Sequence, residues 1–334
     1  MKQIITAFRD VAACLAVILS GALCCALAPA AFAQSWPAKP VRAIFPSPGG
    51  GGLEVLIRVL ANQLSPMWGQ PVIVESRPGA NTLLGTEFVA RSAPDGYTLL
   101  ITSDQTFTIN PHLYAKLPYD PLKDFQPVTR LVALSQLMVV NPSLPALNLK
   151  ELIALAKAKP GFYSYASYGS GSHAHLGTEM LKSKAGIDLV HVPYKGLAQA
   201  QMAVIGGEIP ITWSGVASSL GSVRAGRLRA IAISGAKRVA QLPELPTFAE
   251  LGFPEVDANA WFGVFVPAAT PRPIVDRIHA DLVKVMADTG FREKEVLAKG
   301  YEYSGFGPDE FSAFIRAEIE RRREVVRISG ARVE

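Results

Sequence analysis

Cysteine is missing from most of the chain: of 334 residues, only Cys14, Cys24 and Cys25 are cysteines. Residues 34–334 can therefore form no disulfide framework, no thiolate nucleophile and no cysteine metal site. Charged residues are few as well, at 18% of the chain, and residues 34–334 carry 31 basic and 27 acidic side chains. That balance does not predict nucleic acid as a partner, and its slight positive excess favours anionic small molecules.

The usual motifs of catalytic and cofactor sites are also missing. No Gly-x-Ser-x-Gly sequence occurs, and no Gly-Lys-Ser/Thr follows the glycines at 49–52. Gly169-x-Gly171-x-x-Ala174 matches a dinucleotide fingerprint only loosely. His173 and His175 lie two residues apart on a predicted helix, so they do not share a face as metal ligands would. We predict no catalytic residue, no metal site and no cofactor, which argues against an enzyme.

The N-terminal segment has the pattern of a secretory signal. Lys2 and Arg9 provide a basic start, residues 11–27 are apolar or small, and Ala31-Phe32-Ala33 matches a cleavage site. We expect residues 1–33 to be a signal peptide that is cleaved after Ala33, which would export the protein to the periplasm. An uncleaved membrane anchor or a lipoprotein is the alternative.

From Val41 onwards, predicted strands and helices alternate, which is typical of βαβ units and of mostly parallel sheets. The predicted strands are Val41–Phe45, Val72–Glu75, Tyr97–Thr102, Gln136–Val140, Tyr163–Ser167, Val190–Val192, Ile211–Trp213, Leu228–Ser234 and Trp261–Val266. The predicted helices are Leu53–Leu64, Asn81–Ser92, Leu149–Ala158, His173–Ala185, Ala198–Ile205, Pro273–Ala287 and a last helix from Pro308. We predict an α/β fold of two lobes: residues 34–130, completed by 235–334, and residues 131–234.

The sequence predicts the apolar faces of two helices. In the first, Val55, Leu56, Val59 and Leu60 form the apolar face. In the last helix, the apolar face is formed by Phe311, Phe314, Ile315 and Ile319. The run Arg321-Arg322-Arg323 is expected to be solvated near the end of this helix, where cations suit the helix dipole.

The loops that follow strands are the expected binding positions, because ligands of open α/β sheets bind beyond the carboxyl ends of strands, near helix N-termini. Three such loops supply candidates for holding an anion through backbone N–H groups and hydroxyls. They are Ser47, Pro48, Gly50, Gly51 and Gly52 in the first, Ser103, Asp104 and Thr106 in the second, and Tyr168, Gly169, Ser170, Gly171, Ser172 and His173 in the third. Ser172 or Ser170 is the expected N-cap of the helix that begins at His173. Ordinary turns remain the alternative for each loop.

Several motifs, in order, resemble those of one known family. They are Trp36-Pro37-Ala38-Lys39-Pro40, Ala93-Pro94-Asp95-Gly96-Tyr97, Asn110-Pro111-His112-Leu113-Tyr114, His191-Val192-Pro193-Tyr194-Lys195-Gly196, Gly226-Arg227-Leu228-Arg229-Ala230, Leu242-Pro243-Glu244-Leu245-Pro246 and Trp261-Phe262-Gly263. The chain resembles the solute receptors of tripartite tricarboxylate transporters, also called the Bug family. The resemblance runs from Trp36 to about Gly330.

The resemblance implies a periplasmic binding protein of the Venus-flytrap kind, type II-like, in which each lobe is a mixed, mostly parallel sheet flanked by helices. It implies a small carboxylate ligand, one carboxylate of which is held by two strand–helix loops, partly through ordered waters. It also implies integral membrane transporter subunits as partners. A monomer is expected. A sensory co-receptor for a membrane kinase is the alternative function, followed by an exported α/β enzyme.

Departures from the resemblance bear on the ligand. Ser47 and Trp213 replace an aromatic residue and a phenylalanine that relatives usually carry, and Ser214 stands where an aspartate is common. We expect Trp213 and Tyr168 to form flat apolar walls and Ser214 to contact the ligand. The hypothesis is a dicarboxylate, a tricarboxylate or an aromatic carboxylate without an amino group.

Overall fold

The computed structural model of the chain describes residues 36–48 and 52–333. The predicted signal peptide and three loop glycines, Gly49, Gly50 and Gly51, lie outside the described residues. The chain divides into two units, residues 1–38 and residues 39–334, and the second contains the secondary structure described here.

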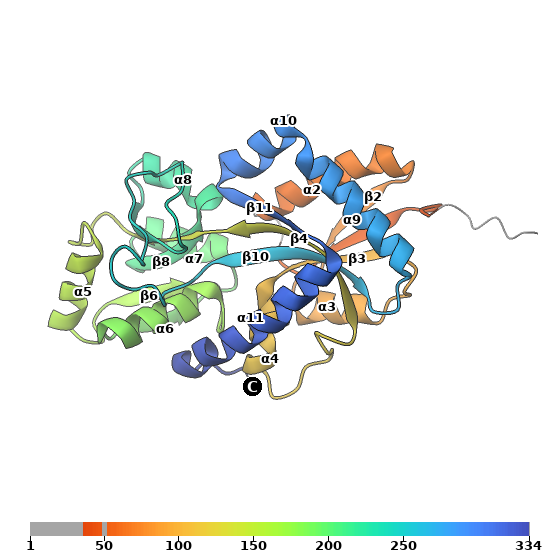
Figure 1. The fold of residues 1–334 in the computed structure, drawn as a ribbon. Helices are drawn as coiled ribbons and strands as arrows, with labels where there is room; N and C mark the ends of the chain where they lie inside the picture. Colours follow the sequence, from red (N-terminus) through yellow and green to blue (C-terminus); the bar gives the residue numbers. More distant parts are fainter. Residues whose placement is uncertain (1–35, 49–51, 334) are drawn as a thin grey trace, which may run out of the picture. The chain divides into compact units, whose positions relative to one another are not determined.

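Two sheets organise the second unit (Figure 1). The six-stranded sheet has the order β11-β4-β10-β3-β1-β2, formed by β1 (Val41–Phe45), β2 (Val72–Ser76), β3 (Thr98–Ser103), β4 (Phe125–Leu134), β10 (Ala260–Pro267) and β11 (Tyr301–Phe306). The five-stranded sheet has the order β7-β6-β8-β5-β9, formed by β5 (Gln136–Val140), β6 (Ser164–Ser167), β7 (Val190–Pro193), β8 (Ile211–Gly215) and β9 (Arg229–Ile233). Each sheet mixes parallel and antiparallel pairs, as predicted, but neither is mostly parallel. Three of the five strand pairs in the six-stranded sheet and two of the four in the other are antiparallel.

Helices cover both faces of the six-stranded sheet (Figure 1). On one face lie α2 (Gly52–Trp68) and α9 (Arg272–Ala287). On the other lie α3 (Leu83–Ala90) and α11 (Pro308–Ser329), whose Phe311 and Ile315 pack with Ile44, Leu100 and Phe265 of the strands. Short elements, namely the π-helical turn η1 (Gln105–Ile109), α4 (Asn110–Leu113), α10 (Thr289–Phe291), η2 (Arg292–Val296) and η3 (Leu297–Lys299), complete this lobe.

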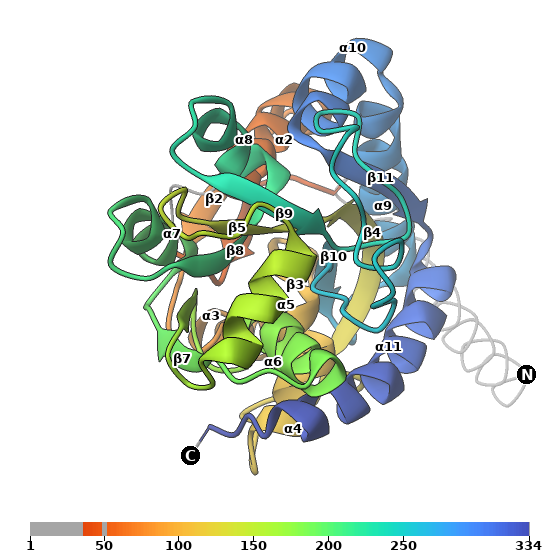
Figure 2. The ribbon, with the colours of Figure 1, turned by 90° about the vertical axis from the view of Figure 1, so that its left-hand side faces the viewer.

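The five-stranded sheet has an apolar cluster on each face. Helices α5 (Leu149–Ala158) and α6 (His173–Ala185) pack against Met138, Tyr165 and Trp213. Helices α7 (Leu197–Ile205) and α8 (Val216–Arg224) pack on the opposite face, in a cluster with Leu137, Val139 and Ala166. Helix α6 also contacts α11 of the other lobe (Figure 2). Among the described residues, no helix combines the length and the apolar character that a membrane span requires.

The chain passes between the sheets close to Ser135 and again close to Asn259. Strand β4 ends at Leu134 in the six-stranded sheet, and β5 begins at Gln136 in the other. After β9 the chain stays with the five-stranded sheet, because Phe248, Val256 and Ala258 belong to its core. The expected lobe boundaries, 130/131 and 234/235, therefore differ from this packing, and we propose a division at residues 135 and 259.

Some local predictions are wrong in detail. Val55 is 48% exposed, although Leu56 and Leu60 are buried as expected. The helix expected from Asn81 begins only at Leu83. Arg322 is 1% exposed rather than solvated, because it falls one turn beyond Glu318 on the buried stripe of α11.

Candidate functional site

Loops at the carboxyl ends of strands from both sheets meet in this structure. His173, the first residue of α6, places Nε2 at 2.8 Å from Asp104 Oδ1, directly after β3. Close by, a Cβ atom added to Gly169 would lie 3.5 Å from Asn81 Oδ1, and one added to Gly171 would overlap Leu113. The second and third predicted loops are therefore brought together across the two lobes.

The first predicted loop is described only at its ends. Ser47 is half-buried, and its carbonyl accepts a hydrogen bond from Ser76 Oγ at 2.7 Å. Pro48 is exposed, and Gly52 begins α2. Gly50 and Gly51, the two glycines expected to approach an anion most closely, lie outside the described residues.

The second loop is buried and its polar groups are paired. Ser103 is 8% exposed, whereas Asp104 and Thr106 are fully buried. The Thr106 hydroxyl lies 2.6 Å from Thr102 Oγ1 and 2.8 Å from Thr82 Oγ1. Thr106 therefore ties η1 to the start of α3, which is a structural role in this conformation.

A further loop, between β2 and α3, also reaches this region and is absent from the prediction. Ala80, Asn81 and Thr82 have φ angles of 45°, 52° and 77°. The left-handed region is strained for a β-branched threonine, and such strain persists where the surroundings enforce it. Asn110 Nδ2 donates to the Asn81 carbonyl at 2.9 Å, and Asn81 Nδ2 donates to Tyr114 Oη at 3.0 Å. The only local signal is Gly79 followed by Ala-Asn, since asparagine tolerates this region.

The third loop satisfies most of its own hydrogen bonds. Ser172 is the N-cap of α6, as predicted, and its Oγ accepts from the His175 amide at 3.4 Å. The Gly171 amide donates to His175 Nδ1 at 3.0 Å, and Ser167 Oγ accepts from the Gly169 amide. Burial raises the pKa of Tyr168, the nearby Asp104 carboxylate raises it further, and a hydrogen bond from the Ala174 amide opposes both. Tyr168 therefore stays a neutral hydroxyl beside Asp104, and Ser170 is half-buried.

Trp213 is not at the meeting point of the loops. Trp213 is fully buried, donates from Nε1 to Thr178 Oγ1 at 2.9 Å and stacks on Phe248 at 5.1 Å. Its neighbour Ser214 is also fully buried on the alternate face of β8. In this conformation both side chains pack inside the second lobe, so we leave them out of the proposed binding set.

Two histidines form a stack beneath the third loop. The rings of His175 and His191 lie 4.0 Å apart and almost parallel, at 8°. Burial is the largest cause that lowers the pKa of His175, to about 3, and the neighbouring His191 adds to it. The pKa of His191 is lowered by burial as well. Within residues 36–48 and 52–333, no three His, Cys, Asp or Glu side chains are grouped as metal ligands.

Comparison with known proteins identifies the family of this site. The model of the "Tripartite tricarboxylate transporter family receptor" matches residues 56–330. The chain belongs to the family of tripartite tricarboxylate transporter receptors. Protein BugT of Bordetella pertussis is 36% identical over 303 residues, which cover 90% of this chain and 93% of BugT. The resemblance derived from the sequence motifs is thereby confirmed.

Solved structures of similar receptors extend over the same region. R. palustris Rpa4515 with adipate has a TM-score of 0.83 and 31% identity, covering 89% of this chain and all of that chain. MatC from Rhodopseudomonas palustris with bound malate has a TM-score of 0.80 and 27% identity, covering 87% of this chain and all of that one. The structure of the periplasmic binding protein BugD has a TM-score of 0.82 and 30% identity, covering 90% of this chain and all of that chain. This likeness and the two sheets confirm the two-lobe α/β fold of periplasmic binding proteins.

Proposed function

We propose that this receptor captures a small carboxylate between its two lobes and delivers it to integral membrane subunits of a tripartite transporter. One observation carries the proposal: loops at the carboxyl ends of strands in both sheets meet, with Asp104 and His173 in contact. Helix N-termini and glycine-rich turns at such positions are suited to anions. Similar receptors with adipate or malate bound support the ligand class.

The proposed contact residues are those of the three loops, without Trp213 and Ser214. They are Ser47, Pro48, Gly50, Gly51, Gly52, Ser103, Asp104, Thr106, Tyr168, Gly169, Ser170, Gly171, Ser172 and His173. Asp104 is the one acidic residue in this set, and it is already paired with His173 and Arg322. A ligand ammonium group needs an unpaired carboxylate, so we propose a di-, tri- or aromatic carboxylate that lacks an amino group.

A thermal-shift panel tests the ligand class. It contains aliphatic dicarboxylates, tricarboxylates, aromatic carboxylates and acidic amino acids. A ligand at a hundred times its Kd stabilises the folded state by about 2.7 kcal/mol, which is a measurable rise in melting temperature. We expect a rise with a carboxylate that lacks an amino group. A rise with aspartate or glutamate alone would contradict the proposal.

Export, oligomeric state and the absence of catalysis belong to the same proposal. We propose that the protein acts as a periplasmic monomer, is cleaved after Ala33 and releases its ligand chemically unchanged. Mass spectrometry of the exported protein is expected to give an N-terminus at Gln34. Size-exclusion chromatography with light scattering is expected to give one chain, and the ligand recovered after incubation should be intact.

A further inference from the structure

A buried contact between Asp104 and His173 joins the two lobes. Asp104 follows β3 of the six-stranded sheet, and His173 is the first residue of α6 in the other lobe. His173 Nε2 lies 2.8 Å from Oδ1 and 3.0 Å from Oδ2 of Asp104. Asp104 is fully buried and His173 is 4% exposed, so water does not screen the pair.

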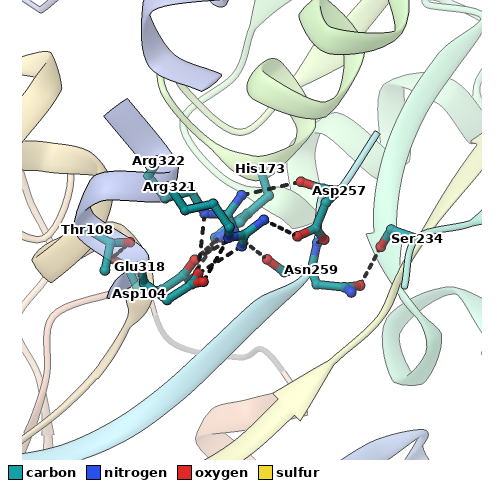
Figure 3. Close-up of polar contacts among 9 residues, drawn as sticks. All are labelled: Asp104, Thr108, His173, Ser234, Asp257, Asn259, Glu318, Arg321 and Arg322. Atoms are coloured by element: carbon teal, nitrogen blue, oxygen red, sulfur yellow. Dashed lines mark hydrogen bonds and ion pairs between the residues drawn. The ribbon is translucent and has the colours of Figure 1, made fainter. Parts of the chain in front are cut away.

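Arg322 holds the Asp104 carboxylate from the other side (Figure 3). Its Nη2 lies 3.4 Å from Asp104 Oδ2 and donates to the Asn259 carbonyl at 2.9 Å. Its Nη1 donates to the Asp257 carbonyl at 3.3 Å. A guanidinium that is 1% exposed is stable only when such acceptors surround it, so Arg322 fixes where Asp104 points.

The same network continues to both crossings between the sheets. Asn259, at the second crossing, accepts on Oδ1 from Ser234 Oγ at 2.6 Å (Figure 3). Ser234 Oγ in turn accepts from the amide of Gln136, which follows the first crossing, at 3.0 Å. The crossings are tightly packed here, because a Cβ added to Gly235 would lie 3.0 Å from Asn259 Nδ2 and 3.3 Å from Ser135 Oγ.

Opening of the lobes would break the links of this network that cross from one lobe to the other. Asp104 and Arg322 both belong to the lobe of the six-stranded sheet, because α11 packs on β4 and η1. His173 moves with α6 and the five-stranded sheet. The bond between Asp104 and His173 therefore forms only in the closed arrangement. The same holds for the bonds of Arg321 and Arg322 to Asp257. The bond between Asp104 and Arg322 persists in both arrangements.

We propose that Asp104 and His173 are a closing pair that stabilises the closed receptor, with Arg322 as the residue that positions Asp104. This inference rests on the proposed function, in which the lobes close on a ligand. The pair acts by holding the two lobes together: it raises the closed population of the empty receptor and slows opening of the loaded one. Its contribution to affinity therefore lies in the dissociation rate.

The test measures lobe closure directly, by electron–electron distance measurements between two spin labels. Lys157 on α5 and Lys284 on α9 are exposed, lie in different lobes and serve as cysteine labelling positions. The chain's own cysteines, at positions 14, 24 and 25, are in the segment proposed to be removed on export. The full-length gene is expressed, and the exported protein is labelled and measured without ligand.

Asp104→Asn and His173→Asn are the test variants. The neutral asparagine at 104 weakens the hydrogen bond between the two residues, and the asparagine at 173 is too short to reach Asp104. His173→Gln restores a donor of similar reach and is the rescue variant. Asp276→Asn and His279→Leu, both on α9 and away from the lobe contact, are the matched controls. Circular dichroism and melting curves establish that each variant is folded.

We expect the ratio of open to closed receptor to rise about tenfold or more in Asp104→Asn and in His173→Asn, the scale of a hydrogen bond to a charged group. His173→Gln and the controls should keep the distances of the unmodified receptor. With a ligand from the panel, stopped-flow binding should show a similar increase in the dissociation rate.

Unchanged distances in both folded variants would overturn the closing pair, as would a rescue variant that opens as far as His173→Asn. Because the distances are measured without ligand, this result does not depend on the ligand class. A receptor whose distances shift as expected but that binds no carboxylate would retain the closing pair and overturn the proposed function instead.

Discussion

Trp213 Nε1 donates a hydrogen bond to Thr178 Oγ1 at 2.9 Å, which joins β8 to α6 inside the second lobe. The indole is fully buried against Phe248, and a Cβ added to Gly177 would lie 3.3 Å from its ring. The large aromatic side chain that the sequence suggests as a wall of the binding site is therefore a core residue that fixes α6 beneath the third loop.

Replacement of Trp213 by phenylalanine tests that assignment. The change removes the donor to Thr178 and leaves a small cavity, so we expect a loss of about 2 kcal/mol in the free energy of unfolding. Urea denaturation measures it, and ligand affinity should stay within the scatter of the unmodified receptor. Full stability combined with weaker binding would return Trp213 to the binding site.

Gly171 should not tolerate a side chain. Its φ is +76°, and an added Cβ would lie 2.1 Å from Leu113 Cδ1 in the opposite lobe. Gly171→Ala is therefore expected to strain the third loop and to favour the open arrangement, which the same spin-label distances report.

The matched controls separate strain from contact. Gly221→Ala on α8, where nothing lies within 4 Å, should leave the lobes closed and stabilise the helix by up to about 1 kcal/mol. Leu113→Ala combined with Gly171→Ala should cost less than the sum of the single changes, because the overlap disappears. Strict additivity would mean that Gly171 and Leu113 do not meet.

Acid should destabilise the stack of His175 and His191. Burial lowers the pKa of His175 from 6.5 to about 3, so the unfolded chain binds more protons than the folded chain between these values. Stability is therefore full above pH 6.5 and falls as the pH drops towards 3. Asp257 adds to the loss at the acid end: burial raises its pKa, but the Arg322 and Arg321 guanidinium groups more than offset this and hold the pKa below its usual range.

The contribution of His175 to this loss of stability in acid is measured by comparison with His175→Gln. The glutamine keeps an acceptor for the Gly171 amide but does not titrate. We expect a shallower fall in the free energy of unfolding between pH 6.5 and pH 4 in this variant. Urea titrations at half-unit steps of pH measure it. Parallel curves for the variant and the unmodified receptor would contradict the assignment.

Two adjacent arginines should differ sharply in their contribution to stability. Arg322→Met leaves Asp104 buried without its guanidinium partner, which should cost about 3–5 kcal/mol. Arg323 pairs with Glu320 at the surface, where both side chains are 64% exposed. Arg323→Met should therefore change the free energy of unfolding by less than about 0.5 kcal/mol. Equal losses would show that Arg322 does not hold Asp104.

Local sequence patterns predict most elements here because the elements are amphipathic or follow clear breaks. Strands Val41–Phe45 and Gln136–Val140 and helices Leu149–Ala158 and His173–Ala185 occur as predicted. Strand β4 is missed because Pro127 interrupts its pattern, and Pro127 lies next to a register shift against β10. Its partners β10 and β11 are more than a hundred residues away, so no local window contains the pairing.

The candidate site is likewise predictable in its local features but not in its long-range contacts. The loops after β3 and β6 are predicted from their positions behind strands, and Ser172 caps α6 as expected. The contact of Asp104 with His173 joins residues 69 positions apart, and the one with Arg322 joins residues 218 positions apart. A basic run near a helix end suggests solvent, and only the phase of Arg322 relative to Ile315 on α11 indicates burial.

The central claim, that the receptor recognises a carboxylate, is tested most directly by two calorimetric titrations. One uses the carboxylate that raises the melting temperature most, and the other uses its uncharged amide analogue. If the receptor recognises a carboxylate, the acid should bind one molecule per chain and the amide should bind at least a hundredfold more weakly, as expected for a charge-assisted site. Equal affinity for the acid and the amide, or no binding of any carboxylate by the folded protein, would contradict the account.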